Sequence, residues 1–336
     1  MPNIIFSEGS GLNDSIYGNS QAPIRMFLEK RAEAFEAKSL LKHMFHMGTS
    51  NHWAEKYTTM TAMDGFQPVG NGGEHPLDGM QESFSKMFEH MVWKNGFAIE
   101  REIIDDAKLM DMRKRPDAFI TAYHRTREQF GAAIYCGAIS GKSSIDFRGK
   151  SFDVTGADKR CVFDTKHPSV LGKGTQSNRF SDELSADSLA AAETAMQNFT
   201  GDNGEILDVV PKTIMIANDY QMKKKAFEIV GADKDPNTAN NGFNYQYGRW
   251  NIIINPYLNR FLALGLKPWI LLDPEYNETN AGAVWLDRIS LEVKSRIDPN
   301  TDNNVWSGYS RFSAGFNDWR FACVGGMEGG TQLIAG

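Results

Sequence analysis

The feature that most constrains the fold of this chain is a long helical run between Glu102 and Ile139. In its second part, Phe119, Tyr123, Phe130 and Ile134 follow one another at steps of four, seven and four, so a helix places them on one stripe. At about 1.5 Å per residue, a run of this length spans roughly 50 Å. A helix that is so long and apolar along one stripe needs a broad surface beside it, such as a sheet.

Pro116 divides this run into two parts. A proline in a helix interior removes a hydrogen bond and clashes with the preceding turn, whereas the first turn tolerates it. We therefore expect the long straight helix to begin at Pro116, with Ile103 to Lys114 forming a shorter helix set at an angle. A helix that continues unbroken through Pro116 would contradict this expectation.

The rest of the chain mixes helical and extended patterns, which favours an α+β fold. Residues 1 to 22 are rich in Gly, Asn and Ser and predict a flexible arm. The expected helices are Pro23 to Gly48, Ser185 to Phe199 with Ser185 as its cap, and a helix capped by Asn218 that ends at Val230. The expected strands are Tyr57 to Met63, Ile145 to Phe147, Arg160 to Phe163, Pro211 to Ala217, Trp250 to Ile254, Pro268 to Leu272, Ala283 to Leu286, Leu291 to Ile297 and Trp319 to Val324.

The run from Ser83 to Ile99 is extended, but neither of its faces is cleanly apolar. One face carries Phe84, Lys86, Phe88 and His90, and the other carries Ser85, Met87, Glu89 and Met91. A ribbon that is apolar on both sides and also charged is poorly suited to an isolated monomer. We therefore predict that this ribbon lies on a neighbouring copy of the chain.

Composition limits the class of function. The chain has 336 residues, 41% of them hydrophobic, so it can bury a core and form two or three subdomains. A net charge of −6 without a long block of one sign does not favour a protein that only binds nucleic acid, although Arg113, Lys114 and Arg115 are candidates for contact with phosphate.

Three widely spaced cysteines indicate free buried thiols and an intracellular site of folding. We find no secretory signal and no stretch of about 20 apolar residues, so we expect no membrane contact.

Candidate catalytic and metal-binding motifs are weak. His43, His46 and His52 form a loose cluster, but the zinc-protease spacing with an intervening Glu is absent, which favours surface or interface histidines over a metal site. Gly70, Gly72 and Gly73 lack the Lys and the following helix of a phosphate loop and are interpreted as turn glycines.

Asp164 and His167 lie in one short turn that ends at a proline. They suggest an Asp-His pair, but such residues more often stabilise the turn itself. No nucleophile, base and oxyanion donors come together in the sequence. We therefore predict no catalytic residue, no cofactor and no metal.

The order of the parts resembles the major capsid protein of tailed bacteriophages, with the HK97-type fold. The passages that carry the resemblance to the major head subunit of Mu-like phages are Phe163 to Pro168, Gly174 to Asn178, Leu184 to Phe199, Pro211 to Ile216, Asn255 to Leu258 and Pro268 to Asp273. The resemblance implies an N-terminal arm and helix at residues 1–50, an extended loop at 51–100, a peripheral domain with the spine helix at 101–172, an axial domain at 173–281 and a return to the peripheral domain at 282–336.

The resemblance also implies a function: a structural shell protein, not an enzyme, that self-assembles into hexamers and pentamers of an icosahedral head around double-stranded DNA. Its expected partners are further copies of itself, scaffold and portal proteins, decoration proteins where the head has them, and DNA bound without sequence specificity. The expected location is the virion, with assembly in the cytoplasm of the host bacterium. The residues predicted to contact neighbouring subunits are Phe66, Phe84, Lys86, Phe88 and Trp93, and those predicted to face DNA are Arg113, Lys114 and Arg115.

Two further expectations come from properties of the family. Some relatives join a lysine of the extended loop to an asparagine with the help of a glutamate. Lys86 and Asn304 stand near the first two positions, but Arg311 or Phe312 stands where the glutamate is expected, so we predict no crosslink. Residues 1–50 are short for a cleaved scaffolding segment, so we expect the subunit to keep its N-terminus and to use a separate scaffold.

Two alternatives remain open. An encapsulin-like compartment shell would have the same fold but hold an enzyme instead of a genome. A metal-dependent enzyme that uses His43, His46 and His52 is the alternative from a different class.

Overall fold

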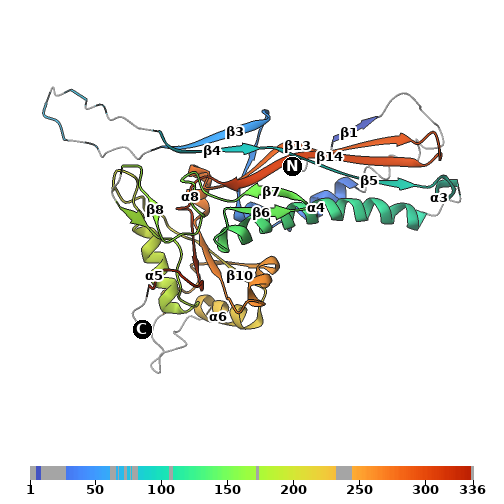
Figure 1. The fold of residues 1–336 in the computed structure, drawn as a ribbon. Coiled ribbons are helices and arrows are strands. Elements are labelled where there is room, and N and C mark those ends of the chain that lie inside the picture. Colours follow the sequence, from blue (N-terminus) through green and yellow to red (C-terminus); the bar gives the residue numbers. More distant parts are fainter. Residues whose placement is uncertain are drawn as a thin grey trace.

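The computed structural model describes residues 5–8, 28–60, 66, 68–71, 74, 75, 77, 82–105, 109–171, 174–231 and 244–333. Within these residues, helices and sheets are mixed, which confirms the expected α+β class (Figure 1). An elongated part that contains a long helix and a long hairpin lies beside a second part built around its own small sheet (Figure 1).

The elongated part is built on a five-stranded sheet. β13 (Ala283–Ile297) and β14 (Asn304–Phe316) form a long antiparallel hairpin, and β5 (Met91–Ile99) pairs antiparallel with β14. β2 (His46–Thr49) and β1 (Ile5–Glu8) pair parallel with successive stretches of β13. The sheet therefore gathers strands from near both ends of the sequence.

The long helix α4 (Leu109–Ile139) lies along this sheet, as its apolar stripe requires (Figure 1). Phe119, Phe130 and Ile134 of the predicted stripe are buried, and Tyr123 is half-buried. One end of the stripe packs with residues of β13 and β14 in a small apolar cluster that also includes Ile120. The five-stranded sheet is therefore the broad surface that we expected beside a helix of this length.

The expected break at Pro116 is wrong. α3 (Arg101–Asp105) is a separate short helix, but α4 begins at Leu109 and continues through Pro116. An interior proline destabilises a helix by about 3 kcal/mol. Full burial of side chains such as Phe119 and Ile120 contributes about 1.5–3 kcal/mol each, so packing against the sheet outweighs the lost hydrogen bond.

The second part contains a four-stranded sheet in the order β11-β10-β12-β15. Its strands are β10 (Thr213–Ala217), β11 (Asn251–Asn255), β12 (Trp269–Leu272) and β15 (Ala322–Gly325). Every residue of β10, β12 and β15 is buried, which explains why their sequences are apolar except for Thr213. The helices of this part are α5 (Ala186–Gln197), α6 (Tyr220–Gly231), α7 (Asn259–Leu262), α8 (Pro274–Asn280) and the 3-10 turn η1 (Pro256–Leu258).

Three two-stranded sheets complete the described strands. β3 (Ala54–Met60) pairs with β4 (Glu82–Glu89) in a ribbon that projects from the body of the molecule (Figure 1). β6 (Ser144–Phe147) and β7 (Lys150–Asp153) form a short hairpin directly after α4. The third sheet consists of the two-residue strands β8 (His167–Pro168) and β9 (Thr175–Gln176).

Helix capping was predicted correctly at one of two positions. Ser185 accepts a hydrogen bond from the Ser188 N–H and caps α5, as expected. At α6, the side chain of Asp219, not Asn218, accepts from the N–H groups of Gln221 and Met222. Asn and Asp are equally good N-cap residues, so the residue types alone do not decide between Asn218 and Asp219.

Several expected boundaries are wrong. The helix predicted to run to Gly48 is a helix over residues 28–36 and a short α2 (Leu41–Met44), after which the chain enters β2. Residues 160–163 form only an isolated bridge between Cys161 and Thr155. β14 was not expected at all, although it is one of the longest described strands.

Candidate subunit-contact surfaces

The base of the β3–β4 ribbon is held by apolar packing. Phe88, on the body-facing side of β4, is only 5% exposed and packs with Val284 and Leu286 of β13. The ring of Tyr57 on β3 meets the ring of Phe88 edge-on, with 5.6 Å between centroids. This side of the ribbon belongs to the core of its own chain.

Lys86 fixes the ribbon to the β6–β7 hairpin. Its Nζ lies 2.6 Å from Asp153 Oδ2, 2.8 Å from the Thr155 carbonyl oxygen and 3.0 Å from Thr155 Oγ1, and its side chain is 11% exposed. Partial burial acts to raise the pKa of the Asp153 carboxyl, but hydrogen bonds from Lys86 and Thr155 overcome this effect and lower it. The ammonium group therefore has its acceptors within its own chain.

A second polar anchor lies nearer the ribbon tip. Ser83 Oγ donates to Asp202 Oδ2 at 3.0 Å. Asp202 also lies 3.7 Å from a guanidinium nitrogen of Arg320, and Arg320 Nη1 lies 3.2 Å from Asp318 Oδ1. These side chains are largely buried, so the ribbon is tied at its second anchor to the part of the molecule that carries the four-stranded sheet.

Trp93 lies on β5, where the chain leaves the ribbon and enters the large sheet. Its ring stacks on Phe312 with 4.8 Å between centroids, and its Nε1–H donates to the Phe312 carbonyl oxygen at 3.3 Å. Phe130 of α4 and Phe152 of the β6–β7 hairpin complete this aromatic cluster. Trp93 is thus an internal link between the sheet, the spine helix and the hairpin.

The tip of the ribbon is different. Phe66 and Leu77, which lie between β3 and β4 in sequence, are fully exposed, and Val69 is half-exposed. Of the five residues predicted to contact neighbouring subunits, Phe66 is free on the surface, Phe84 is half-buried and Lys86 is bound. Phe88 and Trp93 pack within their own chain. Phe66 and Leu77 are more exposed than Trp53, Met87 and Val92, which are the exposed apolar side chains nearer the base.

The predicted DNA-facing cations lie on the first turns of α4. Arg115 donates from Nη2 to both carboxylate oxygens of Glu100, at 2.8 and 2.7 Å, and from Nη1 to the Ala98 carbonyl oxygen. The hydrogen bond from Arg115 is the main cause of a lowered pKa for the Glu100 carboxyl. Lys114 is exposed, and the side chain of Arg113 lies outside the described residues.

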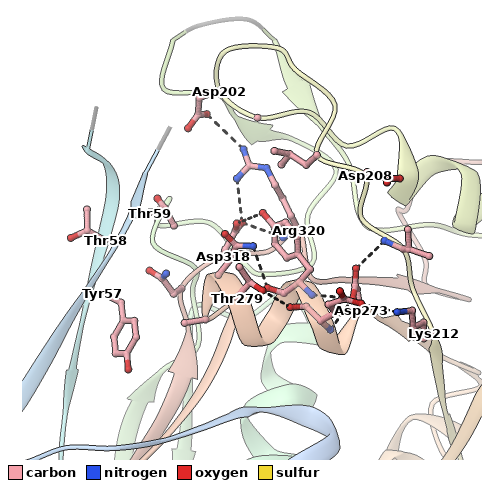
Figure 2. A pocket seen from close by; sticks show the side chains of 18 residues that line it. Tyr57, Thr58, Thr59, Asp202, Asp208, Lys212, Asp273, Thr279, Asp318 and Arg320 are labelled. Atoms are coloured by element: carbon pink, nitrogen blue, oxygen red, sulfur yellow. Dashed lines mark hydrogen bonds and ion pairs between the residues drawn. The ribbon is translucent and has the colours of Figure 1, made fainter. Parts of the chain in front are cut away.

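An open cleft of about 900 Å³ separates the ribbon from α8 (Figure 2). Ribbon residues Tyr57 to Thr59 form one wall, and the opposite wall carries Arg320 and its carboxylate partners (Figure 2). Its acidic side chains are Asp202, Asp208, Asp273, Glu275 and Asp318, whereas its basic ones are Lys212 and Arg320. No sequence motif indicated this cleft, because its lining comes from four segments that are far apart in the chain.

The histidines do not form a metal site in the described part of the chain. No group of three or more His, Cys, Asp or Glu side chains there is arranged to hold a metal ion. His43 and His52 are exposed and His46 is half-buried. The three cysteines are free thiols; Cys136 and Cys323 are buried, as expected, whereas Cys161 is only partly buried. Burial raises the pKa of the Cys136 thiol to about 11.

The turn that contains Asp164 has the structural role that was favoured. Asp164 Oδ1 accepts from the N–H groups of Thr165 and Lys166. His167 pairs instead with Asp158, with 2.7 Å between Nδ1 and Oδ2, and stacks on Trp319. Of the three residues interpreted as turn glycines, Gly70 is exposed, and Gly72 and Gly73 lie outside the described residues. In the described residues, no helix has the length and apolar character needed to cross a bilayer.

The arrangement of projecting ribbon, spine helix and two sheets matches solved capsid structures. A chain from the structure of Mycobacterium phage Patience aligns over 100% of this chain and 96% of its own length, with a TM-score of 0.51 and 12% identity. The virus-like particle from Pyrococcus furiosus aligns over 91% of this chain and 98% of its own, with a TM-score of 0.50 and 9% identity. These likenesses establish the class: the chain has the phage capsid fold, of the HK97 type.

The family follows from the sequence itself. The family model described as phage capsid protein matches residues 88–325, which is well over half of the chain. This chain therefore belongs to the phage capsid protein family, and its function is structural, not enzymatic. The metal-dependent enzyme is thereby excluded. No curated protein matches the chain in a sequence search.

Proposed function

We propose that the chain is the major subunit of a phage head that assembles as hexamers and pentamers of an icosahedral shell around double-stranded DNA. The observation that carries the proposal is the ribbon, which is anchored at its base and presents exposed Phe66 and Leu77 near its tip. Large apolar side chains on a projecting segment are typical of a protein contact surface. A neighbouring subunit would cover them.

The energy available from this contact suits a repeated assembly. Burial of one large apolar side chain contributes about 1.5–3 kcal/mol, from which the loss of rotational and side-chain freedom must be subtracted. A single ribbon contact is therefore weak. In a closed symmetric shell each subunit both gives and receives the same contact, so modest contacts hold the assembly together.

The regions of the chain fit the parts of a shell subunit. We assign the extended loop to residues 51–100, with the β3–β4 ribbon as its free portion and β5 as its connection to the large sheet. Residues 1–50 supply the N-terminal arm and helix. Residues 101–172 and 282–336 would form the peripheral domain, and residues 173–281 the axial domain.

We propose that no covalent crosslink joins the subunits. The Lys86 ammonium is engaged by Asp153 and Thr155 of its own chain. Asn304 is 1% exposed at the start of β14, where it pairs with Ile99 and Ile297. Arg311 or Phe312 stands where a catalytic glutamate was expected. Ladders of shell-sized species that survive boiling in detergent would contradict the proposal.

The other partners follow from assembly around a genome. We propose a scaffold protein, a portal, decoration proteins where present, and DNA bound without sequence specificity, with assembly in the cytoplasm of the host bacterium. Arg113, Lys114 and Arg115 remain candidates to face DNA, and Arg115 is also bound to Glu100. The rival is a compartment shell of the same fold with a protein cargo. The match to the phage capsid family favours the head.

Expression of the chain followed by negative-stain microscopy tests the proposal. We expect closed shells or ring-shaped capsomers. A protein that stays monomeric at all concentrations, with and without a co-expressed scaffold, would contradict it. Nucleic acid extracted from particles made during infection distinguishes a head from a compartment, since only the head holds the genome.

A further inference from the structure

The five-stranded sheet has a face that α4 does not cover. Leu291 and Trp306 pack with Phe119 and Ile120 of α4, which identifies the face that points toward the helix. Successive side chains of a strand point to opposite faces, so the register of the sheet defines the other face. This open face comprises Val92, Lys94, Glu292, Lys294, Arg296, Val305, Ser307, Tyr309 and Arg311.

Cations dominate the open face. Lys94, Lys294 and Arg296 are exposed, and none of them makes an ion pair with a described residue. Arg311 is half-buried on the same face, and the one carboxylate there, Glu292, is also half-buried. The open face therefore carries an excess of positive charge, although the net charge of the whole chain is −6.

The carboxylates at the end of the β13–β14 hairpin are engaged elsewhere. Asp302 pairs with Arg101, with 3.1 Å between Oδ2 and Nη1. Asp298 Oδ1 accepts from the Asn300 N–H at 3.0 Å within the turn. Neither carboxylate pairs with a cation of the open face, so these cations are available to a partner.

Apolar groups lie among the cations. The Lys94 Nζ lies 5.7 Å from the centroid of the Tyr309 ring, and Tyr309 is half-buried. Val92 is 48% exposed, and Val305 is half-buried. A surface that combines apolar area with positive charge is complementary to a segment that is apolar and negatively charged.

The sequence of the ribbon tip has this composition. Residues 61–82 contain four carboxylates and no Lys or Arg. Among them, Glu74 and Glu82 are exposed and make no ion pair with a described residue. Phe66 and Leu77 are fully exposed. The tip therefore offers negative charge and apolar area together.

The two surfaces lie toward opposite ends of the molecule. The β3–β4 ribbon and the free end of the β13–β14 hairpin project in opposite directions (Figure 1). Lys294 and Arg296 lie near that free end, because β13 ends at Ile297. A contact between tip and open face therefore forms between two chains. Two different surfaces that bind each other form a head-to-tail contact, and such contacts can close into rings.

We propose that the ribbon tip of one subunit lies on the open face of the next subunit, where Lys94, Lys294 and Arg296 attract its carboxylates and Phe66 and Leu77 pack among the apolar side chains. This inference rests on the proposed shell function and names the surface that receives the ribbon. The attraction selects the open face over the rest of the subunit surface.

Charge reversal on both surfaces tests the contact. Full-length protein is prepared as wild type, as a face variant with Lys294→Glu and Arg296→Glu, as a tip variant with Glu74→Lys and Glu82→Lys, and as the combination of all four. Assembly is followed by sedimentation and negative-stain microscopy. Like charges oppose docking, so the face variant and the tip variant should each need at least about tenfold more protein to assemble. The combination should recover most of this loss, because opposite charges face each other again.

A matched control separates the site from the change in net charge. Lys142→Glu with Lys166→Glu reverses two exposed cations outside the five-stranded sheet and changes the net charge as much as the face variant does. It should assemble like wild type. Thermal melting of each dissociated variant checks that it is folded.

Photocrosslinking from the open face locates the partner without a change of charge. A photoreactive phenylalanine analogue replaces Val92, and assembled and dissociated wild-type protein are irradiated. Mass spectrometry should find crosslinks to residues 61–82 of another chain in the assembled sample and none in the dissociated one. Crosslinks from assembled protein that never reach residues 61–82 would overturn the proposal, also where a charge variant does not fold.

The outcomes are distinct. Wild-type protein that never assembles would refute the proposed function, not this contact in particular. If wild type assembles and the folded face and tip variants do so equally well, or if the combination is no better than either, the contact does not exist. If the face variant assembles normally but its particles package less DNA, the open face binds nucleic acid and not a second subunit, which also overturns the proposal.

Discussion

The base and the tip of the β3–β4 ribbon are built in opposite ways. At the base, Phe88 is buried against β13 and Lys86 is bound to Asp153, and farther along β4 Ser83 donates a hydrogen bond to Asp202. Toward the tip, Phe66 and Leu77 are exposed. A base of this kind fixes the direction in which the ribbon projects, and a tip of this kind offers surface to a partner. Substitutions should therefore affect folding at the base and assembly at the tip.

The largest loss of stability is expected from the buried charges behind the second anchor. Arg320→Leu leaves Asp202 and Asp318 without their shared cation, and breaking such a buried pair costs about 3–5 kcal/mol. Denaturant unfolding of dissociated protein measures it. The matched control is Arg148→Leu, which removes an exposed guanidinium and should change the free energy of unfolding by less than about 0.5 kcal/mol. Equal losses of unfolding free energy in the two variants would contradict a stabilising role for the buried ion pairs of Arg320 with Asp202 and Asp318.

The apolar part of the base should come next. Phe88→Ala opens a cavity beside Val284 and Leu286 and should lower the free energy of unfolding by about 3 kcal/mol. The matched control is Met87→Ala, one residue earlier on the outer side of β4, where the side chain is exposed. If the two variants have the same midpoint in urea, the ribbon base is not part of the core.

A smaller effect with a defined pH dependence is expected at Lys86. Lys86→Gln should destabilise the fold by about 1 kcal/mol near pH 7, because Asp153 is partly exposed and the pair is screened by solvent. The folded-state pKa of Asp153 is lowered, so its stabilising contribution is present above its unfolded pKa and is lost as the pH falls through the folded value. The difference between wild type and variant should therefore shrink below about pH 4. A constant difference from pH 7 to pH 3 would show that the ion pair contributes nothing.

The smallest effect on folding is expected at the tip. Phe66→Ser should change the free energy of unfolding by less than about 0.5 kcal/mol, since the side chain is fully exposed. The same variant should assemble poorly, because the contact with a neighbour is lost. Unfolding of dissociated protein and sedimentation of assembled protein separate the two properties. Normal assembly of Phe66→Ser would remove this residue from the contact surface.

The difference between base and tip also explains what the sequence could predict. The spine helix, the buried strand β10 and the Ser185 cap depend on residues close together in the chain, and all three were predicted. The alternation in β4 marked Phe88 as facing one side but could not say whether that side meets its own chain or another. That choice depends on β13, almost two hundred residues later.

β14 was missed for a related reason. Gly308 and Gly315 weaken its strand signal, but a Cβ at Gly308 would lie 2.4 Å from Phe119 of the spine helix, and one at Gly315 would lie 2.7 Å from Phe88 of the ribbon. The glycines allow two aromatic rings to approach the strand. The unbroken helix at Pro116 and the acidic cleft likewise depend on tertiary contacts that local patterns do not contain.

Site-specific photocrosslinking from position 66 tests the central claim most directly. A photoreactive phenylalanine analogue replaces Phe66, and the protein is irradiated once as assembled shells and once as dissociated subunits. The account predicts covalent dimers and larger species from the shells and almost none from the dissociated subunits. Assembled shells that yield only monomers, with every crosslink inside a single chain, would contradict a ribbon that reaches from one subunit to the next.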